Sequence, residues 1–110
     1  MSVQDIRDEE DFQMILDSIV GSEYLVVDFY AQWCKPCKNI APEYSKLASV
    51  YTNLNFLKID VDSCDTVADQ YQVGSLPTFL FINRETREVV NRIEGTDMEQ
   101  VEKYCKKYNN

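Results

Sequence analysis

Histidine is absent from this chain of 110 residues, and acidic residues outnumber lysine and arginine by 19 to 11. The resulting formal net charge of -8 at pH 7 disfavours nucleic acid as a partner, because phosphates attract clustered lysine and arginine and no such cluster occurs. Without histidine and without a second Cys-X-X-Cys pair, the sequence also lacks the usual ligand set of a zinc site. We therefore expect neither nucleic acid nor a metal among its ligands.

Long apolar runs, repeats and linkers rich in glycine, serine or proline are missing as well. The longest apolar runs are too short to span a bilayer, and the acidic start "MSVQDIRDEEDF" is unlike a secretory signal or a transit peptide. We expect no membrane partner and a cytoplasmic location, although a mature organellar protein would share these features. The length and the hydrophobic content of 45% suit a single domain over residues 1–110.

Helical and strand patterns alternate along the chain. The segment "YLVVDFYA" is apolar except for Asp28, which is typical of a central strand buried on both faces. The helix before it should begin at the acidic residues "RDEED", carry apolar residues from Phe12 to Ile19 on one face and end at Gly21. Pro42 should kink the helix that follows this strand. Three further segments read as strands: "LNFLKIDVD", "TFLFIN" and "EVVNRIEG". Two further segments read as helices: "CDTVADQY" and "DMEQVEKYCKKYNN". This alternation predicts an α/β fold with helices on both faces of a sheet.

Four cysteines are too few for a disulfide-stapled secreted scaffold, and they form one close pair, in "WCKPC" (33–37), and two singletons. Such a pair can bind a metal, lock a loop as a structural disulfide or cycle between dithiol and disulfide. Cys34 lies where the buried strand gives way to a helix, a position that stabilises a thiolate. Cys37 lies one turn further, on the apolar side, and Pro36 fits the first turn. An exposed, acidified Cys34 beside a shielded Cys37 would suit disulfide exchange, in which the first thiol attacks and the second resolves.

A lone carboxylate inside the buried strand is the second unusual feature. Ionised Asp28 would be costly there, so its pKa should be high and the group is a candidate proton acceptor near Cys37. A capping or strand-edge aspartate is the alternative. Lys58, in "FLKID", shares a strand face with Phe56 and could reach toward Asp28, or it could be a solvated residue of the sheet.

The two single cysteines lie on the apolar sides of their predicted helices. A free cysteine in such a position is usually a small core residue, and we expect this of Cys64 and Cys105. A regulatory thiol, open to glutathionylation or intermolecular disulfide formation, is the alternative for either.

Four motifs resemble those of the thioredoxin family and together span nearly the whole chain. They are "VVDFYAQWCKPCK", "FLKIDVD", "VGSLPTF" and "RIEGTD". The resemblance implies a thioredoxin fold, in which a central five-stranded mixed β-sheet is flanked by four α-helices. It also implies a protein-disulfide reductase in which Cys34 is the nucleophile, Cys37 the resolving thiol and Asp28 the proton acceptor.

The same resemblance implies partners and a contact surface. Electrons would come from NADPH through thioredoxin reductase, with no cofactor bound to this chain. The clients would be disulfide-containing proteins such as peroxiredoxin, ribonucleotide reductase or methionine sulfoxide reductase, and the chain is expected to be a monomer. Pro77 would be cis and leave the backbone of Leu76 free to pair with an extended substrate segment. The expected contact residues around the dithiol are Trp33, Gly74, Ser75, Leu76, Gly95 and Thr96.

Three positions depart from the family's usual pattern. Lys35 stands where glycine is most common, and its charge should favour the Cys34 thiolate and make the protein a weaker reductant. Glu94 replaces an apolar residue beside Gly95, and the turn "NRETRE" (83–88) lacks the usual glycine. Two other functions stay open: a more oxidising donor, like a disulfide isomerase or a tryparedoxin, and a thioredoxin-fold binding subunit with a non-redox role.

Overall fold

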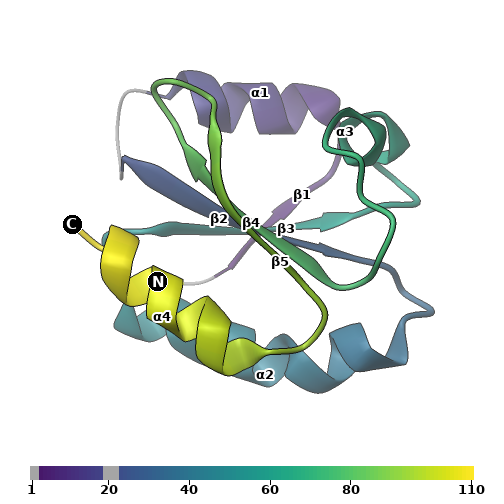
Figure 1. The fold of residues 1–110 in the computed structure, drawn as a ribbon. Helices are drawn as coiled ribbons and strands as arrows, with labels where there is room; N and C mark the ends of the chain where they lie inside the picture. Colours follow the sequence, from purple (N-terminus) through teal and green to yellow (C-terminus); the bar gives the residue numbers. More distant parts are fainter. Residues whose placement is uncertain (1–2, 19–22) are drawn as a thin grey trace.

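The computed structural model describes residues 3–18 and 23–110. Along the chain the elements are β1 (Gln4–Ile6), α1 (Glu9–Asp17), β2 (Tyr24–Tyr30), α2 (Lys35–Val50), β3 (Asn55–Asp60), α3 (Asp65–Gln70), β4 (Thr78–Asn83), β5 (Val89–Glu94) and α4 (Met98–Tyr108). The sheet lies between two helical layers, with α1 and α3 over one face and α2 and α4 over the other (Figure 1). Within the described residues, no helix is long and apolar enough to cross a membrane.

The sheet is mixed and has the strand order β1-β3-β2-β4-β5. β3 is parallel to both β1 and β2, whereas β4 is antiparallel to both β2 and β5. β2 therefore lies at the centre, where Asp28 is opposite Lys58 of β3 on one side and Phe79 of β4 on the other. Five strands with four helices confirm the expected fold class.

Two hydrophobic clusters hold the layers together, one on each face of the sheet. Because successive side chains of a strand point to opposite faces, Val26 joins the cluster under α2 and α4, while Val27 joins the one under α1 and α3. Both residues are fully buried. This confirms the interpretation of "YLVVDFYA" as a strand covered on both faces.

Helix ends follow the local sequence. The Asp8 carboxylate accepts a hydrogen bond from the Asp11 amide at the start of α1, and the Asp97 carboxylate accepts one from the Gln100 amide at the start of α4. α1 ends at Asp17, while Ile19 and Gly21, which were assigned to this helix and its end, lie outside the described residues. α2 continues through Pro42 to Val50.

Residue patterns did not reveal β1, and they left open how the turn between β4 and β5 forms without its usual glycine. β1 has only three residues, one of them buried, so it shows too little alternation to be recognised as a strand. The turn between β4 and β5 is built without glycine, because Arg87 itself adopts a φ of 67°. The Asn83 side chain supports this turn by accepting hydrogen bonds from the amides of Glu85 and Thr86.

Candidate active site

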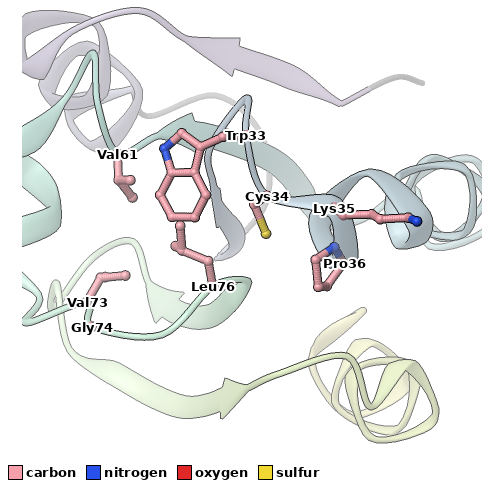
Figure 2. A pocket seen from close by; sticks show the side chains of 8 residues that line it. All are labelled: Trp33, Cys34, Lys35, Pro36, Val61, Val73, Gly74 and Leu76. Atoms are coloured by element: carbon pink, nitrogen blue, oxygen red, sulfur yellow. The ribbon is translucent and has the colours of Figure 1, made fainter.

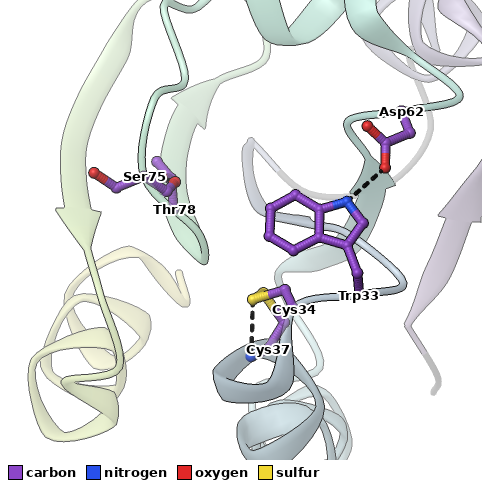
Figure 3. Close-up of a disulfide and its surroundings, with 6 residues drawn as sticks. All are labelled: Trp33, Cys34, Cys37, Asp62, Ser75 and Thr78. Carbon is purple, nitrogen blue, oxygen red and sulfur yellow. Dashed lines mark hydrogen bonds between the residues drawn. A yellow bond between two sulfur atoms is a disulfide. The ribbon is translucent and has the colours of Figure 1, made fainter.

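The cysteine pair lies at the junction between β2 and α2 and forms a disulfide. Cys34 is the N-cap of α2, and its Sγ accepts a hydrogen bond of 3.3 Å from the amide of Cys37 (Figure 3). The first helical turn has amides without intrahelical partners, so a sulfur in this position receives both a donor and the positive end of the helix dipole. This confirms the predicted placement of Cys34.

The predicted difference in exposure between the two cysteines is wrong. Cys34 and Cys37 are both 4% exposed, because Val61 and Leu76 pack against the pair from two other segments of the chain. The difference lies instead in what each residue faces. Cys34 lines a surface pocket and Cys37 does not.

The pocket has a volume of about 480 Å³ and is mostly apolar (Figure 2). Three segments far apart in the sequence form it: the start of α2, the end of β3 and the loop between α3 and β4. Figure 2 shows the Trp33 indole above Leu76, while the Lys35 amino group points away from Cys34. The lining residues are Trp33, Cys34, Lys35, Pro36, Val61, Val73, Gly74 and Leu76.

Not all of the expected contact residues reach the pocket. Trp33, Gly74 and Leu76 line it, whereas Ser75, Gly95 and Thr96 do not. The Ser75 carbonyl accepts a hydrogen bond of 2.6 Å from the Thr78 hydroxyl, and the Gly95 amide donates to the Pro77 carbonyl at 2.9 Å. Ser75 and Gly95 therefore support the loop beside the pocket.

Two lining residues, Val61 and Val73, were not predicted. Val61 directly follows β3, and the carboxyl ends of parallel strands are where ligand sites of α/β sheets gather, so its position carried a usable signal. Val73 follows α3, and only the path of the following loop brings it to the pocket.

Trp33 combines wide exposure with a fixed orientation. Its side chain is 71% exposed, and its Nε1 donates a hydrogen bond of 2.9 Å to Asp62 Oδ2 (Figure 3). An indole held at one end and exposed over its ring is suited to contact with another molecule. Asp62, the last residue of the motif "FLKIDVD", is a further site residue whose role was not predicted.

Asp28 is only 4% exposed, and burial raises its pKa to about 7, while the charge of Lys58 opposes this rise. Its Oδ1 has no hydrogen-bond partner within the described part of the chain. Asp28 shares a strand face with Val26, which packs under α2, and its charge raises the pKa of Tyr44 on that helix. The carboxyl group therefore lies beneath the helix that carries Cys37, with the high pKa expected of it.

Lys58 is half-buried opposite Asp28 on β3. Its Nζ lies 5.5 Å from the centre of the Tyr30 ring, a cation–π contact that keeps the ammonium close to the sheet. Because its charge acts on the pKa of Asp28, Lys58 is an electrostatic neighbour of that carboxyl group, one of the two roles considered for it.

The peptide bond between Leu76 and Pro77 is cis, as the resemblance implied. Within residues 3–18 and 23–110, the backbone of Leu76 forms no hydrogen bond with another backbone group. Its N–H and C=O groups therefore stay available beside the pocket, where an extended segment of another chain would find them.

Comparisons with known proteins agree with the fold. The family model described as Thioredoxin matches residues 3–107. A thioredoxin of Neurospora crassa is 41% identical over 102 residues, which cover 87% of this chain and 78% of that protein. A thioredoxin of Homo sapiens is 39% identical over 100 residues, which cover 91% of this chain and 92% of that protein. The crystal structure of thioredoxin NaTrxh from Nicotiana alata superposes with a TM-score of 0.91 at 32% identity, and the match covers 99% of this chain and 94% of that one.

Proposed function

The chain belongs to the thioredoxin family of thiol–disulfide oxidoreductases, and we propose that Cys34 is its nucleophile and Cys37 its resolving thiol. As a member of this family it reduces disulfides in client proteins by dithiol–disulfide exchange. One observation carries the assignment of the two roles. Only Cys34 lines the pocket through which a client sulfur can approach, and the amide of Cys37 stabilises a thiolate at that position.

The proposed reaction passes two electrons from the dithiol to the client. The Cys34 thiolate attacks one sulfur of the client disulfide, a Cys34–client disulfide forms, and the other client sulfur leaves as a thiolate that takes up a proton from solvent. Cys37, once deprotonated, attacks Sγ of Cys34 and releases the second client thiolate. The pair then holds the Cys34–Cys37 disulfide that the structure contains.

Asp28 is the proposed acceptor of the Cys37 proton. Proton transfer is most effective when the acceptor's pKa lies near the working pH, and a pKa of about 7 meets this condition. Lys58 tunes that pKa, because its charge favours the ionised carboxylate and so prevents a still larger rise.

Client recognition is assigned to the pocket and to the free backbone of Leu76. An extended client segment would pair with Leu76 while its cystine lies between Trp33 and Pro36. The mostly apolar lining suits many sequences, because it offers few charged groups that demand a particular partner. Ser75, in the loop between α3 and β4, and Gly95 and Thr96, after β5, lie outside the pocket lining and would extend this contact to larger clients.

We further infer the cellular setting from the chemistry. The oxidised pair needs an external two-electron donor, and NADPH acting through thioredoxin reductase is the donor we propose. Peroxiredoxin, ribonucleotide reductase and methionine sulfoxide reductase are proposed clients, since each cycle of their chemistry leaves a disulfide to be reduced. We place the protein in the cytoplasm as a monomer that carries electrons between the reductase and these clients.

Reduction of insulin disulfides with NADPH and thioredoxin reductase tests the proposal directly. The wild-type chain should support continuous NADPH oxidation, and Cys34→Ser should abolish it because the attacking sulfur is gone. Cys64→Ser is the matched control and should retain the wild-type rate. If the wild-type chain gave no turnover where another thioredoxin works, a thioredoxin-fold binding subunit would be the better description.

A further inference from the structure

Residues 73–76, the pocket loop, contribute Val73, Gly74 and Leu76 to the pocket that Trp33 and Cys34 also line (Figure 2). The loop begins after α3, a helix of only six residues, and runs into the cis bond before Pro77. Its position relative to Cys34 decides whether a client segment can reach the free backbone of Leu76. What holds the loop in place therefore bears on client recognition.

Arg92 of β5 reaches across to the start of this loop. Its Nη1 donates a hydrogen bond of 2.7 Å to the Tyr71 carbonyl, and its Nη2 donates one of 2.8 Å to the Gln72 carbonyl. These two carbonyls lie at the C-terminal end of α3, where helix carbonyls lack intrahelical partners and the dipole favours a cation. A planar guanidinium fits two adjacent acceptors in a way that a lysine ammonium cannot.

The segment that Arg92 binds has an unfavourable backbone conformation. Gln72 has a φ of 55°, which side chains other than glycine and asparagine rarely adopt. The Gln72 amide donates to the Asp69 carbonyl and the Val73 amide to the Ala68 carbonyl, each at 3.0 Å. Arg92 supplies hydrogen bonds that join this turn to β5, in addition to the apolar contact between the Tyr71 ring and Phe29 of β2.

Glu94 orients the guanidinium. Its Oε2 accepts a hydrogen bond of 3.0 Å from Arg92 Nε. Each of the three guanidinium nitrogens therefore donates to one acceptor: Nε to Glu94, Nη1 to Tyr71 and Nη2 to Gln72. This ion pair also explains the unusual acidic residue beside Gly95, because its charge is balanced within the same strand instead of being left free next to an apolar pocket.

The strand that carries Arg92 holds the other end of the loop as well. The Gly95 amide, directly after β5, donates to the Pro77 carbonyl at 2.9 Å. Gly95 has a φ of 102°, a conformation that strains other residues. β5 thus fixes the pocket loop at both ends, through Arg92 on the α3 side and through Gly95 on the β4 side.

We propose that Arg92 is a positioning residue for client recognition, which holds the pocket loop at the distance from Cys34 that a protein disulfide segment needs. The inference rests on the proposed function of the pocket. Arg92 takes no part in the chemistry of the sulfurs, since its hydrogen-bond partners are Tyr71, Gln72 and Glu94. Its loss should impair reduction of a protein disulfide and spare reduction of a small one that needs only access to Cys34.

The test compares second-order rate constants of the pre-reduced full-length protein with insulin and with the small aromatic disulfide DTNB. Arg92→Met keeps the unbranched stem of the side chain and removes all three donor nitrogens. We expect an insulin rate about tenfold lower, the size of one lost hydrogen bond from a charged group, and a DTNB rate within about twofold of wild type. Arg92→Lys keeps the charge but not the planar guanidinium, so its insulin rate should lie between those of wild type and Arg92→Met. It replaces Arg92→Met in the test if that variant does not fold.

Glu94→Gln is the matched control, because it removes the ion pair and leaves the bonds of Arg92 to the two carbonyls available. It should lower the insulin rate by no more than about twofold, as expected for an exposed ion pair. If Arg92→Met lowers both rates by the same factor, or changes neither, Arg92 does not position the loop for clients and the proposal is overturned. If the wild-type protein itself reduces DTNB but not insulin, the proposed function fails instead, and the two outcomes are distinct.

Discussion

Cys34 and Cys64 both occupy the N-cap position of a helix, and both are almost fully buried, at 4% and 3% exposure. At α2, the Cys34 sulfur accepts the amide of Cys37. At α3, the Cys64 side chain does not cap its helix, and its thiol donates toward the Ile6 carbonyl at 3.6 Å. The same residue type in the same kind of position is thus a hydrogen-bond acceptor in one helix and a donor in the other.

Electrostatics separates the two sites further. Burial raises the pKa of the Cys64 thiol, and the charges of Asp8, Asp60 and Asp5 add to the rise. Cys105, the other free cysteine, is fully buried in α4, where burial raises its pKa to about 12 and Glu102 adds to the effect. Cys34 has instead an amide donor and an opening to a pocket. Cys34 and Cys64 have nearly the same exposed fraction, so the amide donor and the opening to the pocket are what distinguish the reactive cysteine from the buried one.

Cys37→Ser offers the strongest test of this comparison. Without a resolving thiol, steady-state insulin reduction should fall to background and a mixed disulfide with the client should accumulate. Peptide mapping under non-reducing conditions should find the client on Cys34. Attachment of the client to Cys64 or Cys105 in a large fraction of the molecules would contradict the assignment of Cys34 as the reactive cysteine.

Alkylation of the reduced native protein measures the same contrast as a rate. At pH 7, iodoacetamide should modify Cys34 at least about a hundredfold faster than Cys64 or Cys105, because only the thiolate reacts and both other thiols have raised pKa values. Mass spectrometry of timed samples gives the three rates. Denatured protein is the control, in which the differences should nearly vanish.

Asp28→Asn tests the buried group beneath the reactive pair. Below about pH 4 this carboxyl is protonated in the folded and unfolded chains alike, so the substitution should hardly change stability. As the pH rises from 4 to 7 the unfolded chain releases the proton while the folded one keeps it, and stability is lost. Above pH 7, the rise of the Asp28 pKa from 3.8 to about 7 lowers the free energy of unfolding by about 4 kcal/mol. Asp28→Asn should largely restore this stability.

Urea unfolding at pH 4 and at pH 8 checks this expectation. The same variant should also slow the resolving step near pH 7 more than at pH 9, where Cys37 ionises without help. A stability gain that is equal at both pH values would show that Asp28 does not titrate as described. A rate loss independent of pH would assign Asp28 a structural role.

Lys35→Gly should produce the smallest effect. The lysine favours the Cys34 thiolate and hence the reduced form, so its removal should lower the reduction potential. Since Lys35 is exposed and solvent screens its charge, the change should not exceed about 20 mV. Equilibration with a glutathione buffer measures it, with Lys38→Gly as a control further along the helix. An unchanged or higher potential would contradict the assigned role of Lys35.

Patterns in the sequence predicted most of the fold and part of the site. The apolar run around Asp28 identified the central strand, and the acidic residues before α1 and α4 marked their starts, because both signals arise from local contacts. β1 was not recognised from its three residues, since its pairing with β3 depends on a partner more than 50 positions away. The exposure of Cys34 was wrong for the same kind of reason, because Val61 and Leu76 cover it from distant segments.

Amino-acid order alone thus determined the chemistry: two thiols one helical turn apart, at the start of a helix, above a carboxyl group in a buried strand. These relations span at most ten residues, and regular backbone geometry converts such spacing into position. Tertiary structure decided which thiol faces the pocket and that Asp62 accepts the hydrogen bond that orients Trp33. It also decided how Arg92, held by Glu94, binds the start of the pocket loop. The contact of Asp62 with Trp33 and those of Arg92 with Tyr71 and Gln72 join residues 20 or more apart, and only packing of the whole chain brings them together.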